Sequence, residues 1–193
     1  RKEDDWSFII KIHALLESAV SYLLCKALGH DELAEVFSYV ELSGKHAGKM
    51  AFVKALSLLE EPDRRFVSSL SELRNQLVHK VQNVEFDLNQ HIGAMPLECR
   101  AAFAKKFNSF SKGEEVDYQG EKISPEEMFR RDPKTAIWWS AMVTVAIIYK
   151  VREIERFKKE AEHLSFINNT LSRLVSSESE SGAVVPRSLP GDE

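Results

Sequence analysis

The hydrophobic residues at the start of this chain repeat with the period of an α-helix. When successive residues are set about 100° apart, the apolar positions between Asp5 and Leu28 fall on one stripe. Gly29 follows, a residue type that commonly ends a helix. We therefore predict a long amphipathic helix from Asp5 to Leu28. Its stripe contains Trp6, Ile9, His13, Leu16, Val20, Leu24 and Ala27.

Three shorter apolar segments follow, each preceded by a residue type that commonly caps a helix. The segments end near residues 40, 59 and 81, and their capping residues are Asp31, Ser43 and Asp63 respectively. A break at residues 60–63 separates the second segment from the third. The sequence therefore predicts three further helices before residue 83.

The region 83–125 is less regular. Pro96 predicts the start of a helix that ends near Phe107. Residues Val116 to Ile123 surround the pair Gln119-Gly120, a pattern that fits a small β-hairpin.

The C-terminal third of the chain predicts one long helix. After a helix start at Pro125, a second proline at Pro133 opens a segment that is apolar on all sides through Tyr149 and amphipathic from Lys150 to about Leu174. A helix that is apolar all round is usually central in a bundle. The Ser-Glu repeats and prolines after residue 175 are typical of a disordered or partner-dependent tail.

Together these elements predict an all-α fold, a helical bundle with a less regular insertion that contains a small β-hairpin. We expect one domain over residues 1–175 with the insertion at 84–125, and a polar tail at 176–193.

Composition is that of a globular protein, with 44% apolar and 29% charged residues. The longest strongly apolar run, Ala136 to Tyr149, is shorter than the roughly 18–20 residues that a membrane-spanning helix needs. No secretory leader opens the chain, and the two cysteines, Cys25 and Cys99, do not form a disulfide framework. We therefore expect a cytoplasmic protein without membrane association.

Charge is unevenly distributed along the chain. The net charge is −4, yet residues 44–83 carry seven basic and four acidic side chains. A positive region therefore lies within an acidic protein. We predict that Lys45, Lys49 and Lys80 contact RNA phosphates, with a solvated charged face as the alternative.

The sequence contains no metal or nucleotide motif. None of the six histidines has a second His or a Cys three or four residues away, and neither CxxC nor phosphate-loop glycine spacing occurs. We therefore expect no metal ion and no cofactor. The aromatic residues of the second half are predicted to lie in the core rather than to stack on bases; they are Phe103, Phe107, Phe110, Trp138 and Trp139.

The most informative segment is residues 73–80, Leu-Arg-Asn-Gln-Leu-Val-His-Lys. On a helical wheel Asn75 and His79 lie one turn apart, with Ser68 and Ser71, opposite a core face. Arg74 lies on the flank, about 140° from His79, so one straight helix cannot direct both at one atom. Two copies of the helix facing each other would bring two Arg, two Asn and two His into one cleft. The core face contains Phe66, Leu70, Leu73, Leu77 and Val81.

The run Arg74-Asn75-Gln76-Leu77-Val78-His79 matches the Arg-x4-His motif, with Asn directly after Arg, of the HEPN superfamily. The approach from Gly48-Lys49-Met50 to this motif resembles HEPN-like families related to the mannitol operon repressor. The opening helix, with Ile12-His13-Ala14-Leu15-Leu16-Glu17, is similar to them as well. The resemblance covers about residues 6–83 and 133–174.

This resemblance implies a homodimeric helical bundle and, as in many members, a metal-independent endoribonuclease of a toxin or defence system. His79 can move the proton of a ribose 2′-hydroxyl or of the leaving 5′-oxygen. Arg74 can stabilise charge on the phosphate, and Asn75 can orient His79 or bind a phosphate oxygen. Other members are not nucleases, so the alternative is a non-catalytic dimeric regulator or scaffold, in transcriptional regulation or protein–protein interaction.

Glu17 lies within the apolar stripe of the first helix, one turn from His13. A buried carboxylate is costly unless it is paired. We expect Glu17 to pair with Arg74 or His13, and these two residues to orient the motif from behind. The alternative is that water reaches the edge of the stripe at Glu17.

Overall fold

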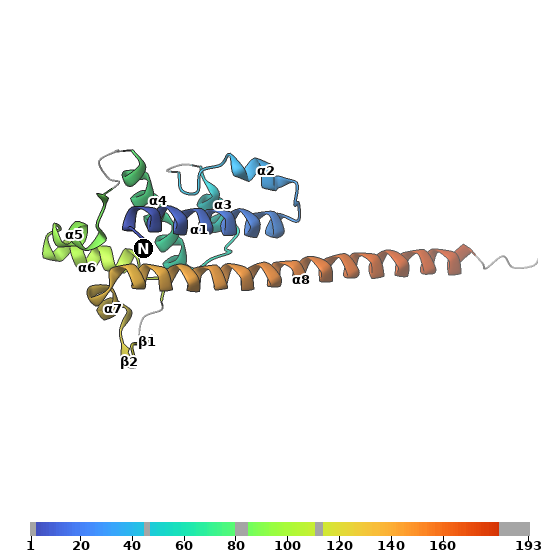
Figure 1. The fold of residues 1–193 in the computed structure, drawn as a ribbon. Helices are drawn as coiled ribbons and strands as arrows, with labels where there is room; N and C mark the ends of the chain where they lie inside the picture. The colour runs from blue at the N-terminus through green and yellow to red at the C-terminus, as the bar shows by residue number, and fades with distance from the viewer. Residues whose placement is uncertain (1–2, 45–46, 80–84, 111–113, 182–193) are drawn as a thin grey trace, which may run out of the picture.

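The computed structural model describes residues 3–44, 47–79, 85–110 and 114–181, with side chains through residue 174. In these residues the chain is 75% helical and forms eight helices and one two-stranded antiparallel sheet, which confirms the predicted all-α fold with a small hairpin (Figure 1). The helices are α1 (Asp5–Leu28), α2 (Leu33–Ser38), α3 (Lys49–Ala55), α4 (Glu61–Val78), α5 (Leu88–Gly93), α6 (Leu97–Lys106), α7 (Pro125–Arg131) and α8 (Pro133–Ser181). The strands are β1 (Val116–Tyr118) and β2 (Glu121–Ile123).

Helix α1 lies at the centre of the body and contacts α2, α3, α4 and α8. Two contacts show that it runs parallel to α8. Asp5 near its start pairs with Lys134 (2.7 Å), and Tyr22 near its end lies under the Arg152 guanidinium (5.2 Å). The predicted stripe is buried, with Ile9, Leu16, Val20 and Leu24 fully inaccessible to water.

Both ends of α1 follow from local sequence. Asp4 occupies the N-cap position and its carboxylate accepts a hydrogen bond from the Ser7 backbone N–H (2.7 Å). Gly29 adopts a left-handed conformation (φ 79°) and its N–H donates to the carbonyls of Cys25 and Lys26. The prediction that this helix ends before Gly29 is therefore confirmed.

Among the described helices, α1 has the length and apolar composition to cross a membrane. An 18-residue window within it has a mean hydropathy of 1.6, and half of that window is buried by the neighbouring helices in this fold. A helix in the core of a globular protein commonly has the same composition. The most membrane-like segment is thus α1 rather than the run Ala136 to Tyr149.

The caps predicted for the second and third helices are wrong. Helix α2 begins at Leu33 without a side-chain cap, and Asp31 instead forms an ion pair with Lys26 (2.7 Å). Helix α3 begins at Lys49, after Gly48 and without a side-chain cap, rather than after Ser43. A Cβ atom on Gly44 would lie 2.1 Å from the Ala47 carbonyl oxygen, so position 44 requires glycine.

Helix α4 also begins earlier than predicted. Glu60 occupies the N-cap position, and Asp63 lies inside the helix with 3% of its surface exposed. Its carboxylate accepts a hydrogen bond from the Thr144 hydroxyl of α8 (3.1 Å). Burial raises the pKa of the Asp63 carboxyl, although the hydrogen bond from Thr144 acts in the opposite direction. Asp63 therefore joins two helices rather than capping one.

The less regular insertion shares the main hydrophobic core. Leu88 of α5 is fully buried, and the Phe107 ring packs edge-on against Phe66 of α4 with ring centroids 6.4 Å apart. The predicted hairpin is confirmed: Val116 pairs with Ile123, and Gln119-Gly120 forms the turn with positive φ angles of 55° and 84°. The expected helices after Pro96 and at Pro125 are also present as α6 and α7.

Helix α8 is long, as predicted, but it lies along one side of the body (Figure 1). Its covered face is buried, whereas Trp138, Trp139 and Tyr149 are 44%, 41% and 60% exposed. The prediction that the two tryptophans lie in the core is therefore wrong, because nothing in the described residues covers this side of α8. The covered face contains Ile137, Ala141, Thr144 and Ile148.

The helix also extends further than predicted. It continues past Leu174 to Ser181, into the segment expected to be a flexible tail. The remaining tail, residues 182–193, lies outside the described residues.

The buried carboxyl of Asp63 makes stability depend on pH. Because burial raises its folded-state pKa, ionisation opposes folding once the pH exceeds the unfolded-state value of about 3.9. We expect Asp63→Asn, which keeps an oxygen for Thr144 but cannot ionise, to raise the melting temperature at pH 7 and to have little effect at pH 4. Thermal unfolding by circular dichroism measures both.

The matched control is Glu72→Gln, an exposed carboxylate on the same helix, which should change neither value. A melting temperature for Asp63→Asn that is lower than that of the wild type at pH 7 would contradict this assignment.

Candidate functional site

A small polar cavity of about 140 Å³ lies between α1, α4 and the loop at residues 41–43. Two helices far apart in sequence supply most of its polar groups. The cavity brings together four residues that the sequence singled out, whereas His79 is not part of its lining. The side chains from α1 and α4 are His13, Glu17, Ser71, Arg74 and Asn75.

Glu17 holds an ion pair at the edge of this cavity. Its Oε1 atom accepts a hydrogen bond from the Lys49 ammonium (2.9 Å), and its Oε2 atom lies 3.8 Å from His13 Nδ1. The Lys49 side chain is 2% exposed, whereas that of Glu17 is 34% exposed. Glu17 is thus the counter-charge for a buried lysine, a partner that the sequence did not identify, and it also approaches His13 as expected.

Arg74 has unused hydrogen-bonding capacity. Its Nη1 atom donates to the Asn75 side-chain oxygen (3.0 Å), and its Nε atom is buried without a hydrogen-bond partner. In the part of the chain that the structure describes, no carboxylate lies within ion-pair distance of this guanidinium. A guanidinium with free donors can bind an anion, and the carboxylates of Glu17 and Glu41, which line the same cavity, act against this binding.

His13 is buried in the same environment. Burial lowers the pKa of its imidazole, the carboxylate of Glu17 raises it, and the positive charges of Arg74 and Lys49 lower it further. The net direction is downward, so the imidazole is held in its neutral form. A neutral histidine can accept a proton or a hydrogen bond inside the cavity.

The polar strip predicted on α4 does not face away from the bundle along its whole length. Ser71 is 3% exposed and lines the cavity, because α1 covers this side of α4. His79 is exposed at the C-cap of the helix, and its backbone N–H donates to the Asn75 carbonyl (3.4 Å). Arg74 and His79 therefore have different surroundings. The predicted core face is buried at Phe66, Leu70, Leu73 and Leu77, and Val81 lies outside the described residues.

The predicted RNA-contacting lysines need one correction. Lys49 is buried and neutralised by Glu17, so its ammonium is not on a surface that RNA could contact. Lys45 and Lys80 lie outside the described residues. The cavity also includes Glu41 and Ser43, which sequence reasoning missed because only the close turn at Gly44 brings this loop to α1.

Comparison with known proteins gives no match. No family model, no curated protein and no solved structure matches the chain. Within the described residues, no group of three or more His, Cys, Asp or Glu side chains is arranged to hold a metal ion. The polar groups that line the cavity are one arginine, one histidine, one amide, two hydroxyls and the carboxylates of Glu17 and Glu41.

Removal of Glu17 tests the buried ion pair. We expect Glu17→Ala to lower the free energy of unfolding by about 3 kcal/mol, because the Lys49 ammonium then stays buried without a counter-charge. The control is Glu61→Ala, which breaks the exposed pair with Arg65 and should cost less than about 1 kcal/mol. Urea denaturation measures both losses. Equal losses in the two variants would show that Lys49 does not depend on Glu17.

The imidazole of His13 reports the charge of Arg74. We expect Arg74→Gln to raise the pKa of His13, because a nearby positive charge disfavours the imidazolium. Arg65→Gln, on the same helix but outside the cavity, should leave it unchanged. NMR titration of the imidazole C–H signals measures this pKa. A His13 pKa that responds equally to both substitutions would contradict the proximity of His13 and Arg74.

Proposed function

We propose that this protein is an HEPN-like, cytoplasmic endoribonuclease that works as a homodimer, cleaves RNA without a metal ion and belongs to a toxin or defence system. One observation carries the proposal: the Arg74 guanidinium lies beside Asn75 at a polar cavity and has no carboxylate partner among the described residues. An arginine in this state binds a phosphodiester through charge-assisted hydrogen bonds.

The roles of the residues follow from their positions. Arg74 binds the non-bridging phosphate oxygens, and Asn75 holds the guanidinium in place. The ribose 2′-oxygen attacks phosphorus while a histidine accepts its proton, and a second histidine donates a proton to the departing 5′-oxygen. His79 is exposed and accessible to RNA, so the two copies of His79 in a dimer can act as this base and acid. His13 and Glu17 line the same cavity from the α1 side, where Glu17 pairs with Lys49 rather than with Arg74.

A second candidate is a non-catalytic dimeric regulator or scaffold, in transcriptional regulation or protein–protein interaction. The exposed apolar side of α8 favours it, because surfaces of this kind commonly bind another protein. In this candidate Arg74 stabilises the body or a bound anion and transfers no proton.

An RNA cleavage assay separates the two candidates. Purified protein is incubated with total RNA and tRNA in the presence of EDTA. We expect the wild type to cleave, and Arg74→Ala and His79→Ala each to lower the rate by about 100-fold or more, because each removes a group that acts in the transition state. His30→Ala, an exposed histidine outside the cavity, is the matched control and should keep full activity.

Each other result has a definite meaning. Equal cleavage by the wild type and His79→Ala would contradict the proposed role of His79. Absence of cleavage by the wild type would favour the regulator or scaffold.

A further inference from the structure

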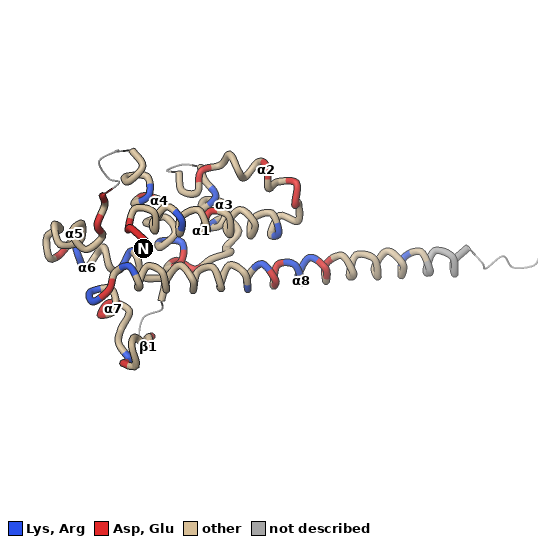
Figure 2. The backbone as a smooth tube through the Cα atoms, in the orientation of Figure 1, with Lys and Arg blue, Asp and Glu red and all other residues tan. Residues whose placement is uncertain are grey.

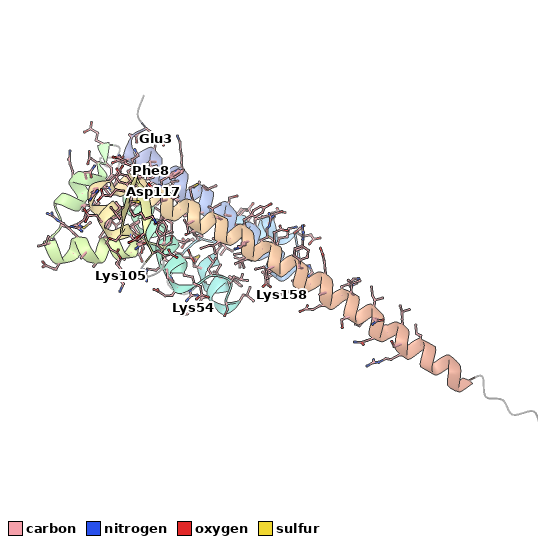
Figure 3. All side chains as sticks on the ribbon, turned by 90° about the horizontal axis from the view of Figure 1, so that it is seen from below. Glu3, Phe8, Lys54, Lys105, Asp117 and Lys158 are labelled. Carbon is pink, nitrogen blue, oxygen red and sulfur yellow. The ribbon has the colours of Figure 1, made fainter. Side chains whose placement is uncertain are left out.

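The distal half of α8 leaves the body. Helix α1, which lies alongside α8, ends at Gly29, and a Cβ atom there would lie 2.7 Å from the Lys159 ammonium. Beyond Lys159 no other helix lies beside α8, as Figures 1 and 3 show; Lys158 is labelled in Figure 3. All side chains from residue 160 to residue 174 are exposed. Tertiary packing, which normally stabilises a helix in a protein, is absent from this segment.

The exposed segment carries the hydrophobic repeat of a coiled coil. Apolar residues recur at alternating intervals of three and four, which assigns them to the a and d positions of three heptads. The a positions are Ile154, Ala161 and Asn168, and the d positions are Phe157, Leu164 and Leu171. Figure 2 shows that the charged residues of this part of α8 gather in its first turns, up to Glu162, and that they are sparse beyond.

This repeat does not face the body. In the proximal half of α8 the buried stripe runs through Ile137, Ala141, Thr144 and Ile148. At about 100° per residue it reaches Glu155 and Lys159, which are half-buried, and not the a and d positions. Ile154, Phe157, Leu164 and Leu171 are instead 50%, 58%, 65% and 54% exposed.

The apolar surface also continues towards the body. Trp139 and Ala146 are exposed on the same side of α8 as the a and d positions. Lys150, which is exposed on this side as well, interrupts the apolar surface between Ala146 and Ile154.

Asn168 indicates which partner covers this surface. In a parallel, in-register pair the two Asn168 side chains meet at the centre and hydrogen-bond to each other, whereas in an antiparallel pair each would face an apolar d residue and lose a partner. A second copy of this chain supplies the matching asparagine at the matching position. Glu153 and Lys158 occupy g and e positions and carry opposite charges, and within one chain they pair with Arg156 (3.0 Å) and Glu155 (2.7 Å), so an interchain pair would replace these contacts.

We propose that residues 154–174 form a parallel, two-stranded coiled coil with the same segment of a second copy. The paired segment is about 30 Å long. It places the two bodies at the same end of the assembly. The interface is separate from α4 and does not depend on the proposed nuclease activity.

Sedimentation equilibrium of the full chain at micromolar concentration tests the pairing. We expect the wild type to be a dimer and the double variant Leu164→Asp, Leu171→Asp to associate at least about tenfold more weakly, because charges at d positions disrupt the seam while the contact proposed for α4 is left unchanged. The control is Phe166→Asp, which changes a 68% exposed apolar residue at an f position on the same helix and should stay dimeric. The double variant should also lose helical circular dichroism signal, while the body melts as in the wild type.

Two outcomes would overturn the pairing. A monomeric wild type would leave this surface to a different partner, and a double variant as dimeric as Phe166→Asp would place the dimer contact elsewhere on the molecule.

Cross-linking tests the orientation. In a Cys99→Ser background, Asn168→Cys should form a disulfide between two chains under mild oxidation, because a positions face each other across a parallel pair at a distance that suits this bond. Phe166→Cys, on the outer side of the helix, should not. Failure of Asn168→Cys to cross-link in a dimeric protein would refute the parallel register.

Discussion

Helix α1 is packed against four other helices, and its burial constrains most of the molecule. Because α1 carries the buried His13 and the half-buried Glu17 on its packed side, the fold must accommodate an imidazole and a carboxylate there. It does so with Lys49, which opens α3 and reaches back to Glu17 (2.9 Å). The ion pair fixes the start of α3 against α1, and the loop before α3 then closes one side of the cavity that Arg74 enters from α4.

Periodicity predicted the helices, but side-chain chemistry did not reliably predict where each one begins. The stripe of α1, the end at Gly29 and the turn at Gln119-Gly120 depend on residues close in sequence, and all three were predicted. Asp31 and Asp63 look like helix caps, yet their side chains contact Lys26 and Thr144 instead. Thr144 is 81 residues away from Asp63, so no local pattern could indicate that contact.

The candidate site was also predictable from the sequence only in part. The helical wheel placed Arg74 apart from His79, and the structure gives them different surroundings. The unexpected carboxylate in the α1 stripe identified Glu17 and, with it, His13. The buried partner of Glu17 was missed, because Lys49 was assigned from its charge to a solvated surface whereas its ammonium lies inside. Sequence shows which side chains are unusual, and the tertiary fold decides what they contact.

The position of Gly29 has a consequence for the reach of the molecule. A helix rises about 1.5 Å per residue, so Ser181 lies roughly 33 Å beyond Lys159, where α1 ends beside α8. Helix α8 therefore holds Ser181 at a fixed distance from the body that contains the Arg74 cavity. Because Gly29 ends α1, it determines how much of α8 has no neighbouring helix. One extra turn of α1, about 5.4 Å long, would shorten this uncovered part of α8 by about 5.4 Å.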